Sequence, residues 1–187
     1  MTKKYCIPLL CAFLLVFCAA CGNTAADSAP QQLYAAQLEE LTEQQYYAYL
    51  QFEQLDTPLM LVTDGAYDDG QGNLFSFDCS HVYYKQADTL SDFGPLSGAG
   101  TAYPISFDGN SLFVAGGHFI ARYTADAQAG MVLAEAAAES FDADGNATYT
   151  YYTAEAEQVV DDNSILINLF EQYSQIPPVT FTAGTAQ

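Results

Sequence analysis

The sequence predicts an α+β fold, in which one antiparallel β-meander sheet carries an N-terminal amphipathic helix and a short C-terminal helix. Two segments, 28–56 and 164–174, place apolar side chains at helical spacing. Between them, short runs rich in Val, Phe, Tyr and Thr alternate with clusters of Gly, Asp and Asn, a pattern typical of strands joined by turns. Half of the residues are apolar, so the chain can bury a core.

The N-terminal helix is expected over Ser28–Asp56. Apolar residues recur on one face of such a helix, whereas Glu39, Glu40 and Glu43 fall on the opposite face. The apolar face would consist of Tyr34, Leu38, Leu41, Ala48, Phe52 and Leu55. Thr57-Pro58 should end the helix, because a residue that precedes proline avoids α geometry.

The central region is expected to form the sheet, with turns at "FDGNSLF" and "FDADGNATY", where Asp, Gly and Asn tolerate tight turns. The expected strands are 59–64, 74–85, 90–96, 102–107, 111–115, 118–124, 131–141 and 148–152. The stretch "ISFDGNSLFVAGGHFIARYTADAQAGMVLAEA" resembles one blade of a β-propeller. The strand region is too short for the four or more blades of a propeller, so we expect a meander, and the resemblance implies no activity.

The C-terminal helix is expected over Ser164–Ser174, after the N-cap candidates Asp161, Asp162 and Asn163. Its apolar face would be Leu166, Leu169, Phe170 and Tyr173. Pro177-Pro178 should end it, and residues 179–182 could add an edge strand.

The first twenty residues have the layout of a secretory signal. Lys3 and Lys4 precede an uncharged apolar stretch over residues 5–20, which is too short and too interrupted by Pro8 for a membrane-spanning helix. The stretch closes on Cys18-Ala19-Ala20-Cys21, which resembles the lipobox of bacterial lipoproteins, with Cys18 where that family usually has leucine.

The resemblance implies that Cys21 is lipidated after cleavage behind Ala20. Two acyl chains would then anchor the protein in the cell membrane, facing the extracytoplasmic side. We therefore expect a signal peptide at 1–20, a lipid anchor and flexible tether at 21–30, one β-rich domain at 31–182 and a loose tail at 183–187. In overall texture the chain is similar to small surface lipoproteins of Gram-positive, Firmicutes-like bacteria.

The charge balance excludes some partners. The chain has a formal net charge of −19, and after residue 20 only Lys85 and Arg122 oppose 23 acidic residues. Such a chain repels nucleic acid and anionic headgroups, whereas a basic partner or a divalent cation stays compatible with it.

The residue types that carry chemistry are sparse. Cys79 is the one cysteine left beside the lipidated Cys21 in the mature chain, so no intramolecular disulfide is expected. Strand alternation would place His81 on the same face as Cys79, where it could activate the thiol, but we favour a buried, unreactive thiol. His81 and His118 are too few for a zinc site, and we expect His118 at a strand edge.

Two groups of acidic residues raise the question of calcium. Asp142, Asp144 and Asn146 alternate like the first ligands of a calcium loop, but Ala147 and Thr153 stand where an EF-hand needs Gly and Glu. Asp64, Asp68 and Asp69 form the second group, and for both we favour turn chemistry over a loose calcium site.

These observations lead to an expected function. We expect no catalytic residue, metal site or cofactor, and a monomer that contacts the membrane through Cys21. The favoured function is a non-catalytic module that binds a protein, glycan or small molecule. The alternatives are a structural or envelope-associated lipoprotein and, behind it, a secreted hydrolase.

Overall fold

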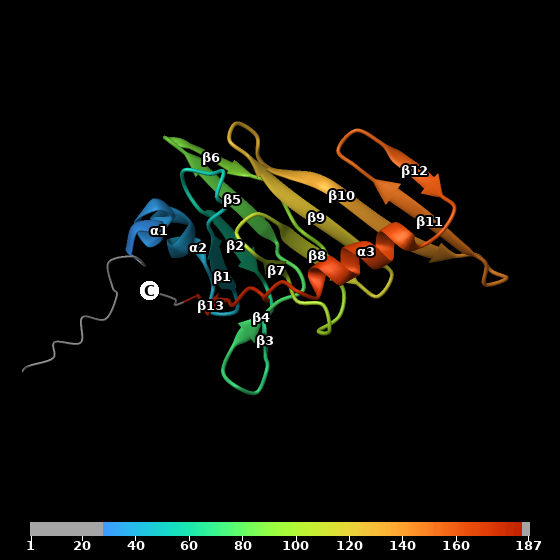
Figure 1. Ribbon diagram of the computed structural model, residues 1–187. Coiled ribbons are helices and arrows are strands. Elements are labelled where there is room, and N and C mark those ends of the chain that lie inside the picture. Colours follow the sequence, from blue (N-terminus) through green and yellow to red (C-terminus); the bar gives the residue numbers. More distant parts are fainter. Residues whose placement is uncertain (1–27, 185–187) are drawn as a thin grey trace, which may run out of the picture.

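The computed structural model describes residues 28–184, and in this range the fold is built from two main antiparallel sheets (Figure 1). The predicted signal peptide, most of the predicted tether with Cys21, and the last residues of the predicted tail lie outside the described residues. Within residues 28–184, no helix is long and apolar enough to cross a membrane.

The first sheet has five strands in the order β13-β1-β2-β5-β6. Their bounds are β1 Tyr46–Leu50, β2 Leu59–Thr63, β5 His81–Gln86, β6 Thr89–Asp92 and β13 Thr182–Ala183. Between β2 and β5 the chain forms a small separate hairpin of β3 (Tyr67–Asp68) and β4 (Leu74–Phe75), which projects from the body of the molecule (Figure 1).

The second sheet is a six-stranded meander in which every strand pairs with its neighbours in sequence, from β7 to β12. Its strands are β7 Ser106–Phe107, β8 Leu112–Gly116, β9 Phe119–Asp126, β10 Gly130–Phe141, β11 Ala147–Tyr152 and β12 Glu157–Val160. The meander topology was predicted from the turn residues, but β12 was not predicted.

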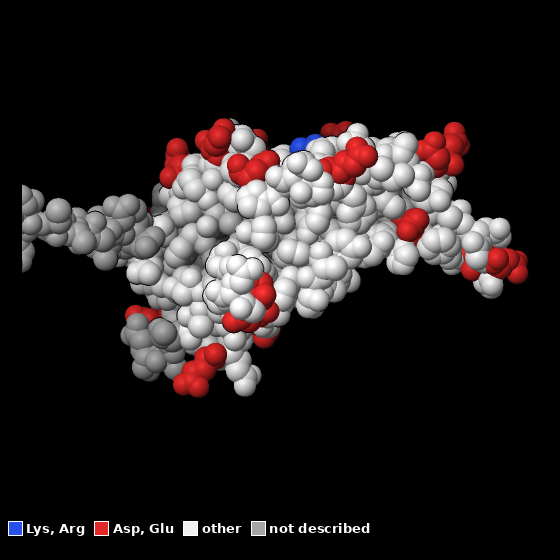
Figure 2. Space-filling model, turned by 60° about the horizontal axis from the view of Figure 1, so that its bottom comes forward, with Lys and Arg blue, Asp and Glu red and all other residues white. Residues whose placement is uncertain are grey.

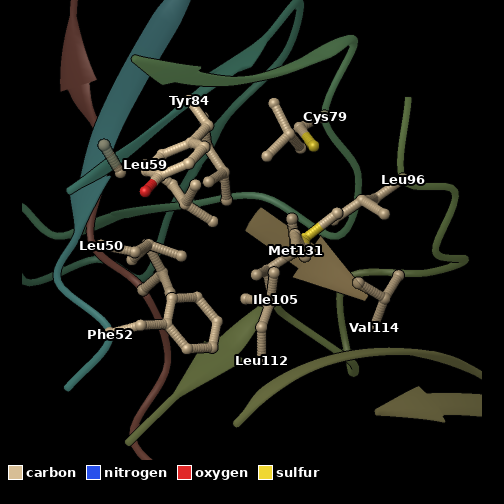
Figure 3. Packing of buried hydrophobic residues seen from close by; sticks show 14 of the residues in the cluster. Leu50, Phe52, Leu59, Cys79, Tyr84, Leu96, Ile105, Leu112, Val114 and Met131 are labelled. Carbon is tan, nitrogen blue, oxygen red and sulfur yellow. The ribbon is translucent and has the colours of Figure 1, made fainter. Parts of the chain in front are cut away.

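The inner faces of the two sheets share the largest hydrophobic core (Figure 3). Leu50 and Leu59 come from the first sheet, and Leu112, Val114 and Met131 come from the second. In β2 and β8 every residue is buried, because the alternate residues that point outward are covered by helices. This double coverage explains why LMLVT and LFVAG are almost continuously apolar.

Helices cover the outer face of each sheet. On the first sheet, Tyr34 packs on Met60 and Val62 together with residues of α1 (Ser28–Leu33) and α2 (Ala35–Glu40). On the second, Leu166 and Leu169 of α3 (Ser164–Tyr173) pack on residues of β8, β9 and β10. The range predicted for the C-terminal helix is confirmed to within one residue.

Two parts of the predicted fold are wrong. The long helix over Ser28–Asp56 is not formed: residues 28–40 form two short helices, and Tyr46–Leu50 form strand β1. In β1, Ala48 and Leu50 enter the shared core while Tyr47 and Tyr49 point to the helices, an alternation that suits aromatic residues in a strand. The single expected sheet is also replaced by two, because β1, β2, β5, β6 and β13 pair in a sheet of their own and do not join the meander.

Candidate ligand-binding pocket

A pocket of about 580 Å³ lies between the segment that follows β2 and the segment that precedes β5. We call it the Asp64–Asp78 pocket. Its walls come from the segment after β2, the segment before β5 and the loop after β6, and they consist of Asp64–Tyr67, Phe77–Ser80, Pro95–Ser97 and Thr101. This volume falls within the range of about 300–1,000 Å³ that is usual for small-molecule sites.

A buried polar network holds two of these walls together. The hydroxyls of Thr63 and Ser76, both fully buried, lie 3.0 Å apart. Each is also close to the carbonyl oxygen of Gly65, at 3.0 and 2.9 Å, and to Oδ1 of Asp78, at 3.3 and 3.2 Å. Because buried hydroxyls are costly to leave without partners, this network fixes the Gly65 and Asp78 backbones at the pocket.

The loop after β6 is fastened on both sides of the pocket. Cys79 and Leu96 exchange two backbone hydrogen bonds of 3.0 Å, and the N–H of Ala99 donates to the carbonyl of Ala115. Between them, Gly98 passes so close to Phe77 that a Cβ at this position would lie 1.8 Å from the Phe77 carbonyl oxygen. The wall therefore depends on a residue without a side chain, and the pocket is formed before any ligand arrives.

The groups that line the pocket are rich in hydrogen-bond acceptors. Asp64 and Asp78 contribute carboxylates, and the lining contains no Lys, Arg or His. The Tyr67 hydroxyl donates to the carbonyl of Thr101 at 2.7 Å, so its proton is already engaged; burial raises the pKa of Tyr67. The hydroxyls that donate to the Asp78 carboxylate, those of Thr63 and Ser76, are fully buried and out of reach of a substrate, which suits binding rather than group transfer.

Cys79 touches this pocket but is not a reactive thiol. Its side chain is 3% exposed in the shared core, and burial raises its pKa to about 12 (Figure 3). The thiol is therefore protonated at neutral pH, and the prediction of a buried cysteine is confirmed.

His81 does not share a face with Cys79, so the alternation argument is wrong at this point. Nδ1 of His81 lies 2.8 Å from Oδ2 of Asp92, and its ring stacks on Tyr83 at 5.2 Å between centroids. Tyr83 contacts the cluster under α1 and α2, on the face opposite to the core that holds Cys79. The chain bends between the two residues at Ser80, which breaks the strand alternation.

Both acidic groups considered for calcium contain carboxylates that accept hydrogen bonds in turns, whereas Asp64 accepts from the Gln45 side chain. Oδ1 of Asp142 accepts hydrogen bonds from the N–H groups of Asp144 and Asn146, and Asp69 does the same for Gln71 and Asn73. Hydrogen bonds from the Asn146 side chain and backbone lower the pKa of Asp142. Within residues 28–184, no three His, Cys, Asp or Glu side chains gather in a way that could hold a metal ion.

A second pocket, of about 490 Å³, lies beside α3. It includes Glu139, whose carboxylate lies 2.8 Å from Nδ1 of His118 in the β8–β9 turn. His118 is at a strand end, as predicted, and its side chain is largely exposed. This histidine–carboxylate pair has no Ser or Cys nucleophile hydrogen-bonded to it in the described part of the chain.

Both basic residues of the described range are engaged away from the Asp64–Asp78 pocket. Nζ of Lys85 donates to the carbonyl of Leu33 at 3.2 Å, and the guanidinium of Arg122 donates to Glu135 at 2.5 and 3.0 Å. Figure 2 shows separate acidic groups across the face it presents and one small basic area near its upper edge. The protein surface is therefore acidic with little internal neutralisation.

The comparisons with known proteins give no relative: no family model, no curated protein and no solved structure matches this chain. The pocket was also not predicted from the sequence. Its walls come from separate segments within residues 64–101 whose approach no local pattern indicates. Its clearest local signal, Gly98, has the appearance of an ordinary loop glycine in the sequence.

Proposed function

We propose that this protein is a lipid-anchored extracytoplasmic surface protein whose folded part binds a ligand without chemical turnover. The anchor rests on the lipobox-like sequence Cys18-Ala19-Ala20-Cys21 and on the apolar stretch before it. With lipid on Cys21, the folded part would be held outside the membrane and available to ligands there.

The observation that carries the binding role is the Asp64–Asp78 pocket. It is preformed, of ligand size, and lined by carboxylates, hydroxyls and aromatic rings. Its one thiol has a pKa raised to about 12, and the hydroxyls that donate to its Asp78 carboxylate are fully buried. These features favour binding over the hydrolase alternative.

The anchor is tested by expressing the full chain in a bacterium fed with labelled palmitate. We expect wild-type protein to carry the label and to sediment with membranes. Cys21→Ala should lose the label and stay unprocessed or change its processing. Cys18→Ala is the matched control, because it removes a neighbouring thiol while keeping small residues before Cys21. Absence of label from the wild-type protein would overturn the anchor.

The pocket is tested with the purified Cys21→Ala chain and a set of cationic, neutral and anionic small molecules, followed by NMR of the backbone amides. We expect at least one class to shift the amides of Gly65, Tyr67 and Ser97. Gly98→Ala should abolish those shifts, because its Cβ would displace the loop from Phe77. If no class shifts these amides, the binding role is wrong and the structural or envelope-associated role is favoured.

A further inference from the structure

We infer that the Asp64–Asp78 pocket selects organic cations, specifically ligands that present a primary ammonium or guanidinium group. This inference rests on the proposed binding function and adds the chemical class of the ligand. It follows from the charge of the pocket, the unused oxygens of its carboxylates and its aromatic rings.

The charge balance comes first. Asp64 and Asp78 bring two carboxylates to the lining, and no basic side chain lines the pocket. Lys85 and Arg122 cannot serve as internal counterions while they hold Leu33 and Glu135. An anionic ligand would meet uncompensated like charge, whereas a cation would relieve it.

Part of the hydrogen-bonding capacity of the lining is already used. Backbone N–H groups of the lining already donate within the protein: Cys79 to Leu96, Leu96 to Cys79, and Ser80 to Val62. The hydroxyl of Ser80 also lies 3.3 Å from the Val62 carbonyl, and that of Tyr67 donates to Thr101. These groups are engaged, whereas the hydroxyls of Ser97 and Thr101 have no hydrogen-bond partner within residues 28–184. The preference for a cation therefore comes from the two carboxylates, which ammonium and guanidinium groups match because they only donate.

The acceptors have unused capacity. Asp64 accepts one hydrogen bond at Oδ1, from the side-chain amide of Gln45, and Asp78 accepts from Thr63 and Ser76 at Oδ1. Within residues 28–184, Oδ2 of neither carboxylate has a hydrogen-bond partner. A carboxylate can accept at both oxygens, so each can still bind a charged donor.

Aromatic rings complete the recognition. Tyr67 and Phe77 both line the pocket, and the faces of such rings attract cations. Gln45 holds Asp64, and the Thr63–Ser76 network holds Asp78, so the two carboxylates are positioned by separate partners before binding. A ligand with a cationic head and a short apolar stem fits this combination.

The test uses four probes of similar size: n-butylammonium, n-butylguanidinium, n-butanol and butyrate. Binding to the purified Cys21→Ala chain is followed through the backbone amides of Gly65, Tyr67 and Ser97. We expect the two cations to shift these amides in a saturable way, and butanol and butyrate to have no such effect at equal concentration. Raising the ionic strength should weaken the binding of the cations.

The carboxylates are tested by Asp64→Asn and Asp78→Asn, each of which keeps an acceptor oxygen for its protein partners. We expect each to weaken n-butylammonium binding about tenfold, in line with the loss of a charge-assisted hydrogen bond. Asp161→Asn, in the exposed loop before α3, is the matched control and should leave binding unchanged. Wild-type-like amide spectra would show that each variant is folded.

Each other outcome overturns the inference in a recognisable way. If butanol or butyrate binds as well as the cations, the pocket binds ligands but does not select cations, and the proposed function stands. If Asp161→Asn weakens binding as much as Asp64→Asn, the cations respond only to surface charge. If neither cation shifts the pocket amides, the inference is wrong, and the wider set of small molecules then decides the binding role.

Discussion

Two tyrosines in the cluster under α1 and α2 should respond in opposite ways to the loss of a single oxygen atom. The rings of Tyr34 and Tyr49 stack with their centroids 6.0 Å apart. The Tyr34 hydroxyl donates to the carbonyl of Pro58 at 2.6 Å and accepts from the N–H of Lys85 at 3.1 Å. The Tyr49 hydroxyl is buried and has no hydrogen-bond partner among the described residues.

The magnitudes follow from these partners. Tyr34→Phe leaves a half-buried carbonyl and a half-buried N–H without this partner and should lower the free energy of unfolding by about 2 kcal/mol. For a chain of this length, that corresponds to a melting temperature lower by roughly 4–8 °C. Tyr49→Phe removes a buried hydroxyl that makes no bond, so stability should stay unchanged or rise by up to about 1 kcal/mol.

The pH dependence provides a second readout. Burial, partly offset by the Lys85 N–H, raises the pKa of Tyr34 from 10.0 to about 12. Because the folded state holds the phenol proton more tightly, this stabilisation is complete below pH 10 and is lost as the pH rises towards 12. Tyr34→Phe should therefore reduce the alkaline loss of stability, without abolishing it, because burial also raises the pKa of Tyr49.

The assay is urea unfolding of the Cys21→Ala chain and its two variants, followed by circular dichroism at neutral pH and near pH 11. The expected order of stability at neutral pH is Tyr49→Phe equal to or above the parent, and Tyr34→Phe below it. Equal losses in both variants, or a larger loss in Tyr49→Phe, would refute the hydrogen-bond assignment.

Three further outcomes are expected. Arg122→Leu should lower the free energy of unfolding by about 1–3 kcal/mol in chemical denaturation, because the half-buried carboxylate of Glu135 loses its charged donor and keeps only the Tyr151 hydroxyl. No loss would mean that the pair is dispensable. Gly130→Ala should lower the melting temperature more than Gly145→Ala. Both positions have positive φ, so alanine brings about 1–3 kcal/mol of strain at each, but of the two only Gly130 would place its Cβ against an aromatic ring, at 2.5 Å. Equal melting temperatures would contradict this reasoning. Cys79 should resist alkylation in the folded protein and react in denaturant, because it is buried and burial raises its pKa to about 12. Rapid labelling of the folded protein would contradict this by showing that the thiol is accessible.

The sequence was sufficient to predict an element where its apolar spacing and its turn residues indicate the same structure. The segment from β7 to β11 is a continuous meander, and its turns lie at the Asp-, Gly- and Asn-rich positions read from the sequence. The α3 helix likewise begins after the Asp-Asp-Asn cluster and ends before the proline pair. In these elements neighbouring residues determine the conformation, so the sequence pattern alone is informative.

The segment 46–50 shows where the pattern is ambiguous. Ala48 fits the spacing of the predicted helix face, yet Tyr47 and Tyr49 also alternate with Ala48 and Leu50 as a strand requires. The choice depends on β2, which pairs with this segment along its whole length, and on the helices that cover the tyrosines. Both partners are distant contacts, which local propensity does not include.

The sequence by itself determined the β-rich character, the meander, the last helix, the acidic charge and the presence of one unpaired thiol in the folded part, because composition and short-range patterns decide these properties. Only the tertiary structure decided the division into two sheets, the separation of Cys79 from His81, and the Asp64–Asp78 pocket. The pocket depends on the approach of Gly98 to Phe77 and on the buried Thr63–Ser76 contact. Such contacts join residues more than ten positions apart, and they form because packing and buried hydrogen bonding bring those residues together.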